Sequence, residues 1–209
     1  RKLGFAARRT MSVANDLYTG IDLGEGPVGL ITYMRTDSIN LAQEALDEIR
    51  DIIPKLFDKD TLPDEKRQYT NTSKNAQEAH EAIRPTSFSR TPNDLKKFLN
   101  KDQFELYSLI WKRTVASQMK DAILDSVSID IGSKEKFFRA SGQSINYAGF
   151  MQVYLEGTDD EDADADSKIL PAMNEGDVVK LEKLDAIQHF TKPPGRYTEA
   201  SLIKNLEKE

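Results

Sequence analysis

The sequence predicts an α+β protein of more than one domain, in which a mostly helical part is followed by an antiparallel β part. Up to about residue 118, apolar residues recur at the three- and four-residue spacing of amphipathic helices. After about residue 120 they alternate with polar residues, as they do in half-buried strands. With 209 residues the chain is long enough to bury a sizeable core, as one large domain or two small ones.

The first helix is predicted over residues 2–18, ending at Gly20. Its apolar stripe consists of Leu3, Ala6, Ala7, Met11, Ala14, Leu17 and Tyr18. The next stretch, IDLGEGPVGLITYM at 21–34, has two short extended runs around a turn rich in Gly and Pro, which predicts a hairpin. We expect its second run to continue as a strand through Tyr33.

Three further helices are predicted in the first part. Asn40 and Gln43 have the spacing of a capping box, and the apolar pattern runs from there to about Ile53. Thr91 precedes a proline that suits the first position of a helix. Asp102 is expected to cap the third, whose apolar face holds Phe104, Tyr107, Ile110, Trp111, Val115 and Met119.

The second part contains several runs with the pattern of strands, separated by glycines. They are AILDSVSIDI, KFFRASG, GFMQVYLEG and DVVKLEKLDA, and together they predict a small antiparallel β unit. A last helix is predicted from about Thr198.

Composition excludes several kinds of site. The chain has no cysteine, which excludes disulfides, thiolate zinc sites and a cysteine nucleophile. No apolar stretch approaches the roughly 20 residues that span a bilayer, so no membrane partner is expected. The lack of cysteine also fits a reducing cytoplasm, which is the expected location.

Charge is uneven along the chain. The net charge is -6, but the run EGTDDEDADAD at 156–166 holds seven acidic residues, and the rest of the chain carries +1. Near the start, RKLGFAARRT has Arg1, Lys2, Arg8 and Arg9 and no acid. A local basic face for an anionic partner is therefore compatible with the negative total. The acidic run itself has the composition of a solvated loop.

The sequence contains no convincing nucleotide-binding motif. GEGPVG at 24–29 matches G-x-G-x-x-G, but a dinucleotide fingerprint follows a strand and opens a helix, whereas here a strand-like run comes next and Pro27 interrupts the pattern. No P-loop is present, so no nucleoside triphosphate site is expected.

The stretch GLITYMRTDS at 29–38 holds the candidate catalytic residues Tyr33 and Arg35, with Asp37 beside them. A phenol ionises only near pH ~10, so its attack on phosphorus needs help. A cation on the phosphate oxygens supplies such help by stabilising the charge that develops in the transition state. On a strand, positions 33 and 35 face the same side. Spacing alone does not distinguish this pair from a structural one.

His80, in EAHEAIRP, is the other candidate. Glu78, Glu81 and Arg84 lie close to it in sequence, and an acid beside a histidine favours the charged form, which can hydrogen-bond a phosphate. A purely structural histidine remains the alternative.

Taken together, these segments resemble the type IA DNA topoisomerases. GLITYMRTDS resembles the active-site tyrosine motif of that family, RKLGFAARRTMSVANDLY the helix before it, and QEAHEAIRPT the histidine segment. LYSLIWKRTVASQM and HFTKPPGRYTEASLIKNLEKE resemble two later stretches, so the likeness covers essentially the whole chain. Met34 and the AHEAIRP run are more similar to the bacterial topoisomerase I branch than to topoisomerase III.

The resemblance implies a fold and a mechanism. Residues 1–118 would form a winged-helix, catabolite-activator-like domain with the tyrosine, 119–187 part of the β-rich arch, and 188–209 the start of the return to the enzyme body. Tyr33 would attack one DNA strand and form a 5′-phosphotyrosine, the other strand would pass, and religation would follow without ATP. Arg35 would clamp the phosphate, His80 would contact the cleaved region, and Asp37 would support them.

The resemblance also implies what lies elsewhere. The family's Mg²⁺ site belongs to a Toprim domain, so no metal is expected in this chain. The chain is expected to be a central fragment that lacks the Toprim domain and is inactive alone. Single-stranded DNA and the missing domains of the same polypeptide are the expected partners of a monomeric, nucleoid-associated enzyme. Arg8 and Arg9 are assigned either to DNA phosphates or to a plain surface. Two alternatives remain open: a non-catalytic winged-helix DNA-binding module and a structural interaction domain.

Overall fold

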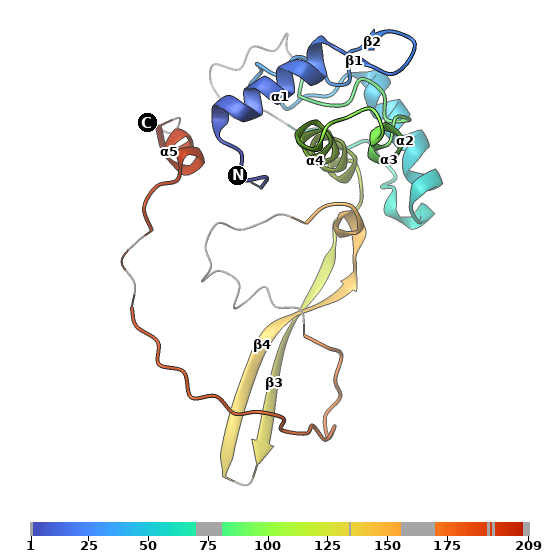
Figure 1. Ribbon diagram of the computed structural model, residues 1–209. Helices are drawn as coiled ribbons and strands as arrows, with labels where there is room; N and C mark the ends of the chain where they lie inside the picture. Colours follow the sequence, from blue (N-terminus) through green and yellow to red (C-terminus); the bar gives the residue numbers. More distant parts are fainter. Residues whose placement is uncertain are drawn as a thin grey trace. The chain divides into compact units, whose positions relative to one another are not determined.

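The computed structural model describes residues 2–69, 81–133, 135–155, 170–191, 193 and 195–206. The chain forms two compact units, Arg1–Leu124 with Ile145–Asp159 and Asp125–Ser144 with Asp160–Glu209. Helices dominate the first unit, and the sheets of the described residues are two-stranded (Figure 1). This confirms the α+β class, while the domain boundaries at 118 and 187 stay predictions.

The first helix and the hairpin after it are shorter than predicted. Helix α1 spans Ala7–Thr19, and β1 (Ile21–Asp22) pairs antiparallel with β2 (Pro27–Val28). The predicted start at residue 2 is wrong because Gly4 adopts a left-handed φ of 64°, which a right-handed helix cannot contain. The predicted end is confirmed, since Gly20 has a φ of 133° and its N–H bonds the Asp16 carbonyl.

Helix α2 spans Gln43–Leu56, and a 3₁₀ turn follows at Lys59–Thr61. The predicted cap at Asn40 is wrong, because the helix begins at Gln43 itself and leaves Asn40 three residues outside. The residue before the helix is Ala42, whose side chain cannot cap. The helix also continues through Pro54, where the missing N–H costs one hydrogen bond close to the helix end.

Helices α3 (Pro92–Leu95) and α4 (Lys101–Ser117) both begin with a capping box. The predicted start at Thr91–Pro92, with proline at the first helical position, is confirmed. The predicted cap at Asp102 is wrong, because Asn100 and Gln103 hold the two ends of that box. Asp102 instead accepts two hydrogen bonds from Arg9 of α1.

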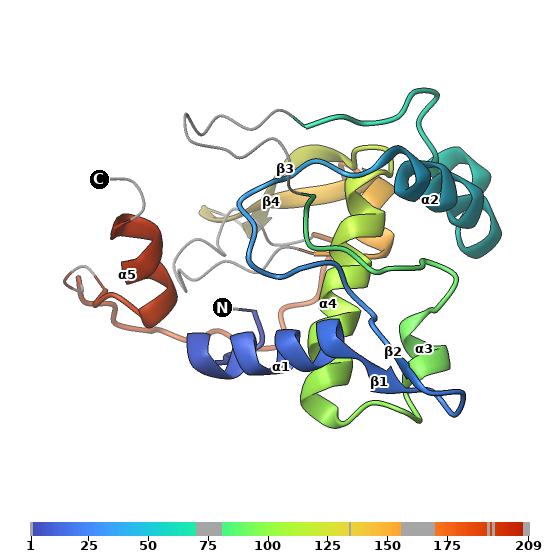
Figure 2. The ribbon, with the colours of Figure 1, turned by 90° about the horizontal axis from the view of Figure 1, so that it is seen from above.

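The core of the first unit lies between α1, α2, α4 and the segment after β2. Figure 2 shows α1 beside α4, and the two helices are in contact. Trp111 of α4 is buried, and its indole N–H donates to the Phe88 carbonyl over 3.1 Å. The least exposed side chains of this core are Leu17, Leu30, Ile31, Ile49, Ile53, Phe88, Tyr107, Val115 and Met119.

The β part contains one long hairpin. Strands β3 (Ile123–Ser133) and β4 (Lys136–Tyr147) pair with each other, as predicted from their alternating pattern. The last helix, α5 (Glu199–Leu206), is also confirmed.

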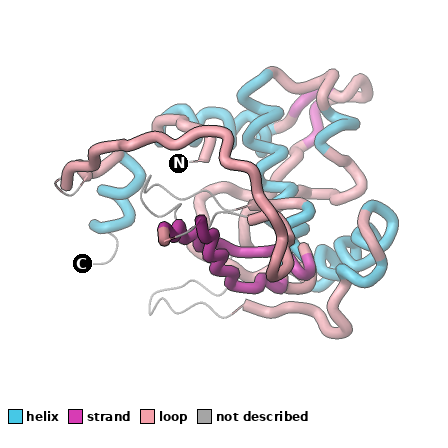
Figure 3. The backbone as a smooth tube through the Cα atoms, turned by 90° about the horizontal axis from the view of Figure 1, so that it is seen from below, coloured by secondary structure: helices cyan, strands magenta, loops and turns pink. Residues whose placement is uncertain are grey.

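Two predicted strands are wrong. Residues 149–152 form a 3₁₀ turn, because Gly149 has a φ of 47° and Phe150 donates its N–H to the Lys120 carbonyl. Residues 177–186 contain no strand, and Figure 3 shows them as loop. Val178 is 97% exposed there, so an alternating pattern without a hydrogen-bonded neighbour does not make a strand. None of the helices in the described residues combines the length and apolar character needed to cross a bilayer.

A close backbone contact joins the end of α1 to the segment after β2. A Cβ on Gly29 would lie 2.7 Å from the Tyr18 carbonyl oxygen, while the Leu30 N–H donates to the Leu17 carbonyl over 2.7 Å. Gly29→Ala is therefore expected to destabilise the chain by about 1–3 kcal/mol, since backbone on both sides must move. Denaturant unfolding measures this. Gly195→Ala, where nothing lies within 4 Å, is the control, and an equal effect of the two would contradict the assignment.

Candidate active site around Tyr33

The segment that carries Tyr33 runs beside the segment that follows His80. Ile31 and Pro85 form an antiparallel bridge, and Thr32 donates its N–H to the Arg84 carbonyl over 2.9 Å. Two stretches about 50 residues apart in sequence are thus joined by backbone hydrogen bonds immediately before Tyr33.

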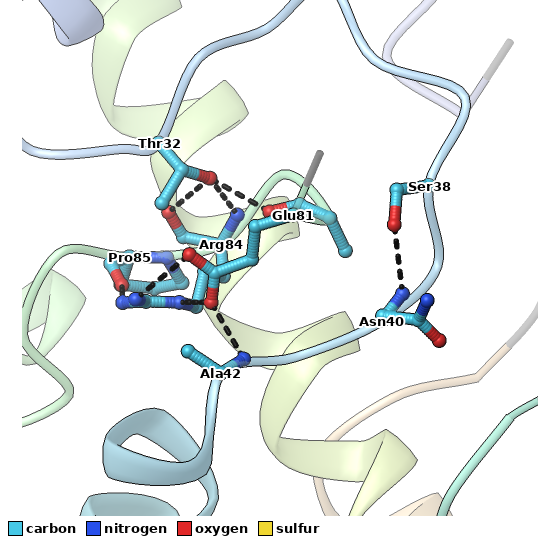
Figure 4. Close-up of polar contacts among 8 residues, drawn as sticks. Thr32, Ser38, Asn40, Ala42, Glu81, Arg84 and Pro85 are labelled. Atoms are coloured by element: carbon cyan, nitrogen blue, oxygen red, sulfur yellow. Dashed lines mark hydrogen bonds and ion pairs between the residues drawn. The ribbon is translucent and has the colours of Figure 1, made fainter. Parts of the chain in front are cut away.

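Side chains reinforce this junction, as Figure 4 shows. The Thr32 hydroxyl donates to the Ala82 carbonyl over 2.7 Å and accepts the Arg84 N–H over 2.9 Å. The Arg84 guanidinium donates to both carboxylate oxygens of Glu81 and to the Pro85 carbonyl. We call Thr32, Glu81 and Arg84 the clamp.

The clamp also holds the other end of the tyrosine segment. Glu81 Oε1 accepts the backbone N–H of Ala42 over 2.8 Å, and the Ala82 N–H donates to the Asn40 carbonyl over 2.8 Å. The Glu81 carboxylate therefore caps the start of α2 from outside the helix, which the sequence pattern could not reveal. Residues 32–42 are fixed at both ends and form a loop between them.

Tyr33 does not lie on a strand, so that prediction is wrong. Among the described residues, the single bridge at Ile31 is the only strand pairing of this stretch, and the chain bends at residues 34 and 35. The alternation nevertheless holds, because Tyr33 and Arg35 are exposed while Met34 between them is buried at 8% exposure. Both candidate side chains therefore reach solvent, with Met34 anchoring the loop in the core.

The hydroxyl of Tyr33 is free of hydrogen bonds to the described residues, and its side chain is 46% exposed. Most other tyrosines are occupied: the hydroxyls of Tyr69, Tyr107 and Tyr147 donate to carbonyls, and that of Tyr154 accepts from Arg113. Burial raises the pKa of Tyr107 far above the usual value of a phenol, which disfavours the phenolate of that residue.

Arg35 forms no ion pair within the described part of the chain, and its guanidinium is exposed. It can therefore accept an external anion without breaking an internal bond. Asp37 is also exposed, and it lines a cavity of about 860 Å³ between α1, residues 34–41 and α4. Neither Tyr33 nor Arg35 lines this cavity, whose walls are mainly apolar.

His80 lies outside the described residues, so its position beside Tyr33 stays a prediction. The adjacent Glu81 is described, and both its carboxylate oxygens are engaged by Arg84, one of them also by the Ala42 N–H. Glu81 thus has a structural role of its own, through Arg84 and Ala42.

The two arginines of α1 differ in their surroundings. The Arg9 guanidinium forms a two-point ion pair with Asp102 at 2.7 and 2.8 Å and lies 4.5 Å from the centre of the Phe5 ring. It joins α1 to α4, which leaves less of its charge for DNA. Arg8 is exposed and has no such partner among the described residues.

The described residues contain no group of three or more His, Cys, Asp or Glu that could hold a metal ion. The acidic run at 156–166 lies entirely outside the described residues.

Comparison with known proteins identifies relatives along the whole chain. The sequence profile of a family described as DNA topoisomerase matches residues 1–209. DNA topoisomerase 1 of Xylella fastidiosa strain Temecula1 is 54% identical over 99% of this chain, and DNA topoisomerase 1 of Rickettsia bellii is 50% identical over 99%. The chain spans about a quarter of the length of these relatives, 26% in each case.

A solved structure agrees in fold. Full-length topoisomerase I from Thermotoga maritima superimposes on 99% of this chain and on 32% of its own, with a TM-score of 0.69 and 34% sequence identity.

Proposed function

The chain belongs to the DNA topoisomerase family, and we propose that it is the tyrosine-bearing part of a type IA enzyme that relaxes negatively supercoiled DNA without ATP. The observation that carries this proposal is Tyr33 itself. Its side chain is exposed and its hydroxyl forms no hydrogen bond to the described residues, on a loop fixed at both ends by the clamp. A pure binding module has no need to present a phenol in this way.

In the proposed reaction, the Tyr33 oxygen attacks the phosphorus of one DNA strand. The phenol loses its proton to solvent, the bond between phosphorus and the 3′ oxygen breaks, and that oxygen takes up a proton from solvent, which gives a 5′-phosphotyrosine and a 3′-hydroxyl. The hydroxyl later attacks the phosphotyrosine and restores both groups. One phosphoester replaces another, so the exchange needs no nucleoside triphosphate.

Arg35 is proposed to bind the non-bridging oxygens of the scissile phosphate. The transition state carries more charge there than the ground state, and a preorganised cation stabilises it selectively. The exposed guanidinium, which forms no ion pair with the described residues, supports this role. His80 is proposed to contact the same phosphate region, Asp37 to support the loop, and Arg8 to contact backbone phosphates, with Arg9 a weaker candidate because Asp102 already binds it.

The rest of the enzyme is proposed to lie in the part of the polypeptide that this chain does not cover. That part would supply the Toprim domain with its Mg²⁺ and the remaining DNA cleft, and the cleavage site would bind single-stranded DNA. The enzyme would act as a monomer on cytoplasmic, nucleoid-associated DNA.

Plasmid relaxation tests this function. Full-length protein carrying this chain should relax negatively supercoiled plasmid with Mg²⁺ and no ATP, and EDTA should stop it. The 209-residue chain alone should leave the topoisomer ladder unchanged at the same molar concentration. An ATP requirement, or relaxation by the chain alone, would contradict the proposal.

A further inference from the structure

Tyr18, at the end of α1, holds its ring against that of Tyr33. The two ring centres are 5.3 Å apart and the ring planes are inclined by 61°, an edge-to-face arrangement. Such pairs are attractive because the positive edge of one ring meets the negative face of the other. Tyr18 is 41% exposed and Tyr33 46%, so the core does not bury either ring.

The backbones that carry the two rings are locked together. The Leu17 carbonyl accepts a hydrogen bond from the Leu30 N–H. The Tyr18 carbonyl packs so closely against Gly29 that a Cβ there would not fit. Leu17 and Leu30 are buried at 0% and 1% exposure. The backbone that carries the Tyr18 ring is therefore fixed by the core, whereas the Tyr33 ring projects from a loop anchored on either side by Thr32 and Met34.

Without the Tyr18 ring, the Tyr33 side chain could rotate about its χ1 and χ2 bonds, since about half of it faces solvent. A nucleophile must hold a near-attack position for its reaction to be fast. The hydroxyl of Tyr18 has no hydrogen bond to the described residues, so the ring and not the hydroxyl makes the contact.

We propose that Tyr18 is a positioning residue, whose ring restricts the Tyr33 phenol to orientations from which it attacks DNA phosphate. This inference rests on the proposed function of Tyr33. It assigns Tyr18 no contact with the reacting atoms.

The test uses full-length Tyr18→Ala, Tyr18→Phe and Met11→Ala with a single-stranded oligonucleotide labelled at one end. Tyr18→Ala should slow single-turnover formation of the covalent adduct about three- to tenfold at saturating DNA, with oligonucleotide affinity unchanged and the protein still folded at the assay temperature. Tyr18→Phe keeps the ring and should restore most of the rate. Met11→Ala, on the same helix with 40% exposure, should match wild type.

Three results would overturn the proposal. They are an unchanged adduct rate in Tyr18→Ala, a loss confined to DNA affinity, and a failure of Tyr18→Phe to restore the rate. Failure of the proposed function looks different, because then the wild-type protein forms no adduct or the Tyr33→Phe protein still forms one.

Discussion

Full-length protein with Tyr33→Phe is expected to form no covalent adduct with DNA and to relax no plasmid, a loss of at least about 10⁴-fold. The substitution removes one oxygen atom and nothing else. Because that hydroxyl makes no hydrogen bond to the described residues, its loss should leave the stability of the fold unchanged. Adduct formation on a labelled oligonucleotide measures the chemistry. The affinity for the oligonucleotide measures DNA binding, and the unfolding midpoint measures stability.

Two variants accompany this experiment. Tyr197→Phe removes another exposed hydroxyl without a partner among the described residues, and should behave as wild type. Arg35→Ala keeps the nucleophile and should lower the adduct rate by about 10²–10³-fold, since it removes charge stabilisation only. Full adduct yield in the Tyr33→Phe protein, or loss of its DNA binding, would contradict the nucleophile assignment.

The second large effect is expected at the clamp. Arg84→Met leaves Glu81 without its ion pair and Pro85 without a donor, in a place where the Arg84 and Glu81 side chains are only 14% and 28% exposed. We expect a loss of about 2–3 kcal/mol in the free energy of unfolding. The adduct rate should fall as well, because the clamp holds both ends of the Tyr33 loop.

Arg139→Met is the matched control for the clamp. Arg139 also forms a two-point pair, with Asp130 on the β3–β4 hairpin, but these side chains are 69% and 54% exposed. An exposed pair contributes little, so the unfolding midpoint and adduct rate should not change. Equal effects of the two substitutions, or a stable Arg84→Met protein with wild-type adduct rate, would show that the clamp does not support the site.

Local signals in the sequence predict much of this fold. The end of α1 at Gly20, the start of α3 at Thr91–Pro92 and the β3–β4 hairpin each depend on residues within a few positions, and all are confirmed. The strand predicted at 177–186 is wrong because a strand depends on a second segment that pairs with it, and the local pattern does not say whether one is present.

The candidate site shows the same division. Tyr33 and Arg35 could be named from sequence because GLITYMRTDS resembles the active-site tyrosine motif of the type IA family, whereas their spacing alone does not distinguish them from a structural pair. The clamp could not, because Glu81 meets Ala42 across 39 residues and Thr32 meets Arg84 across 52. A conventional cap was expected at Asn40, and only the folded chain reveals that Glu81 supplies it. Likewise, nothing in the sequence pattern sets Tyr18 against Tyr33.

The most direct measurement identifies the atom that links protein to DNA. Full-length protein is trapped on a single-stranded oligonucleotide, digested with protease, and the nucleotide-bearing peptide is sequenced by mass spectrometry. We expect a 5′-phosphate ester on the peptide that contains Tyr33. A linkage to any other residue, or through a 3′-phosphate, would contradict the proposed mechanism.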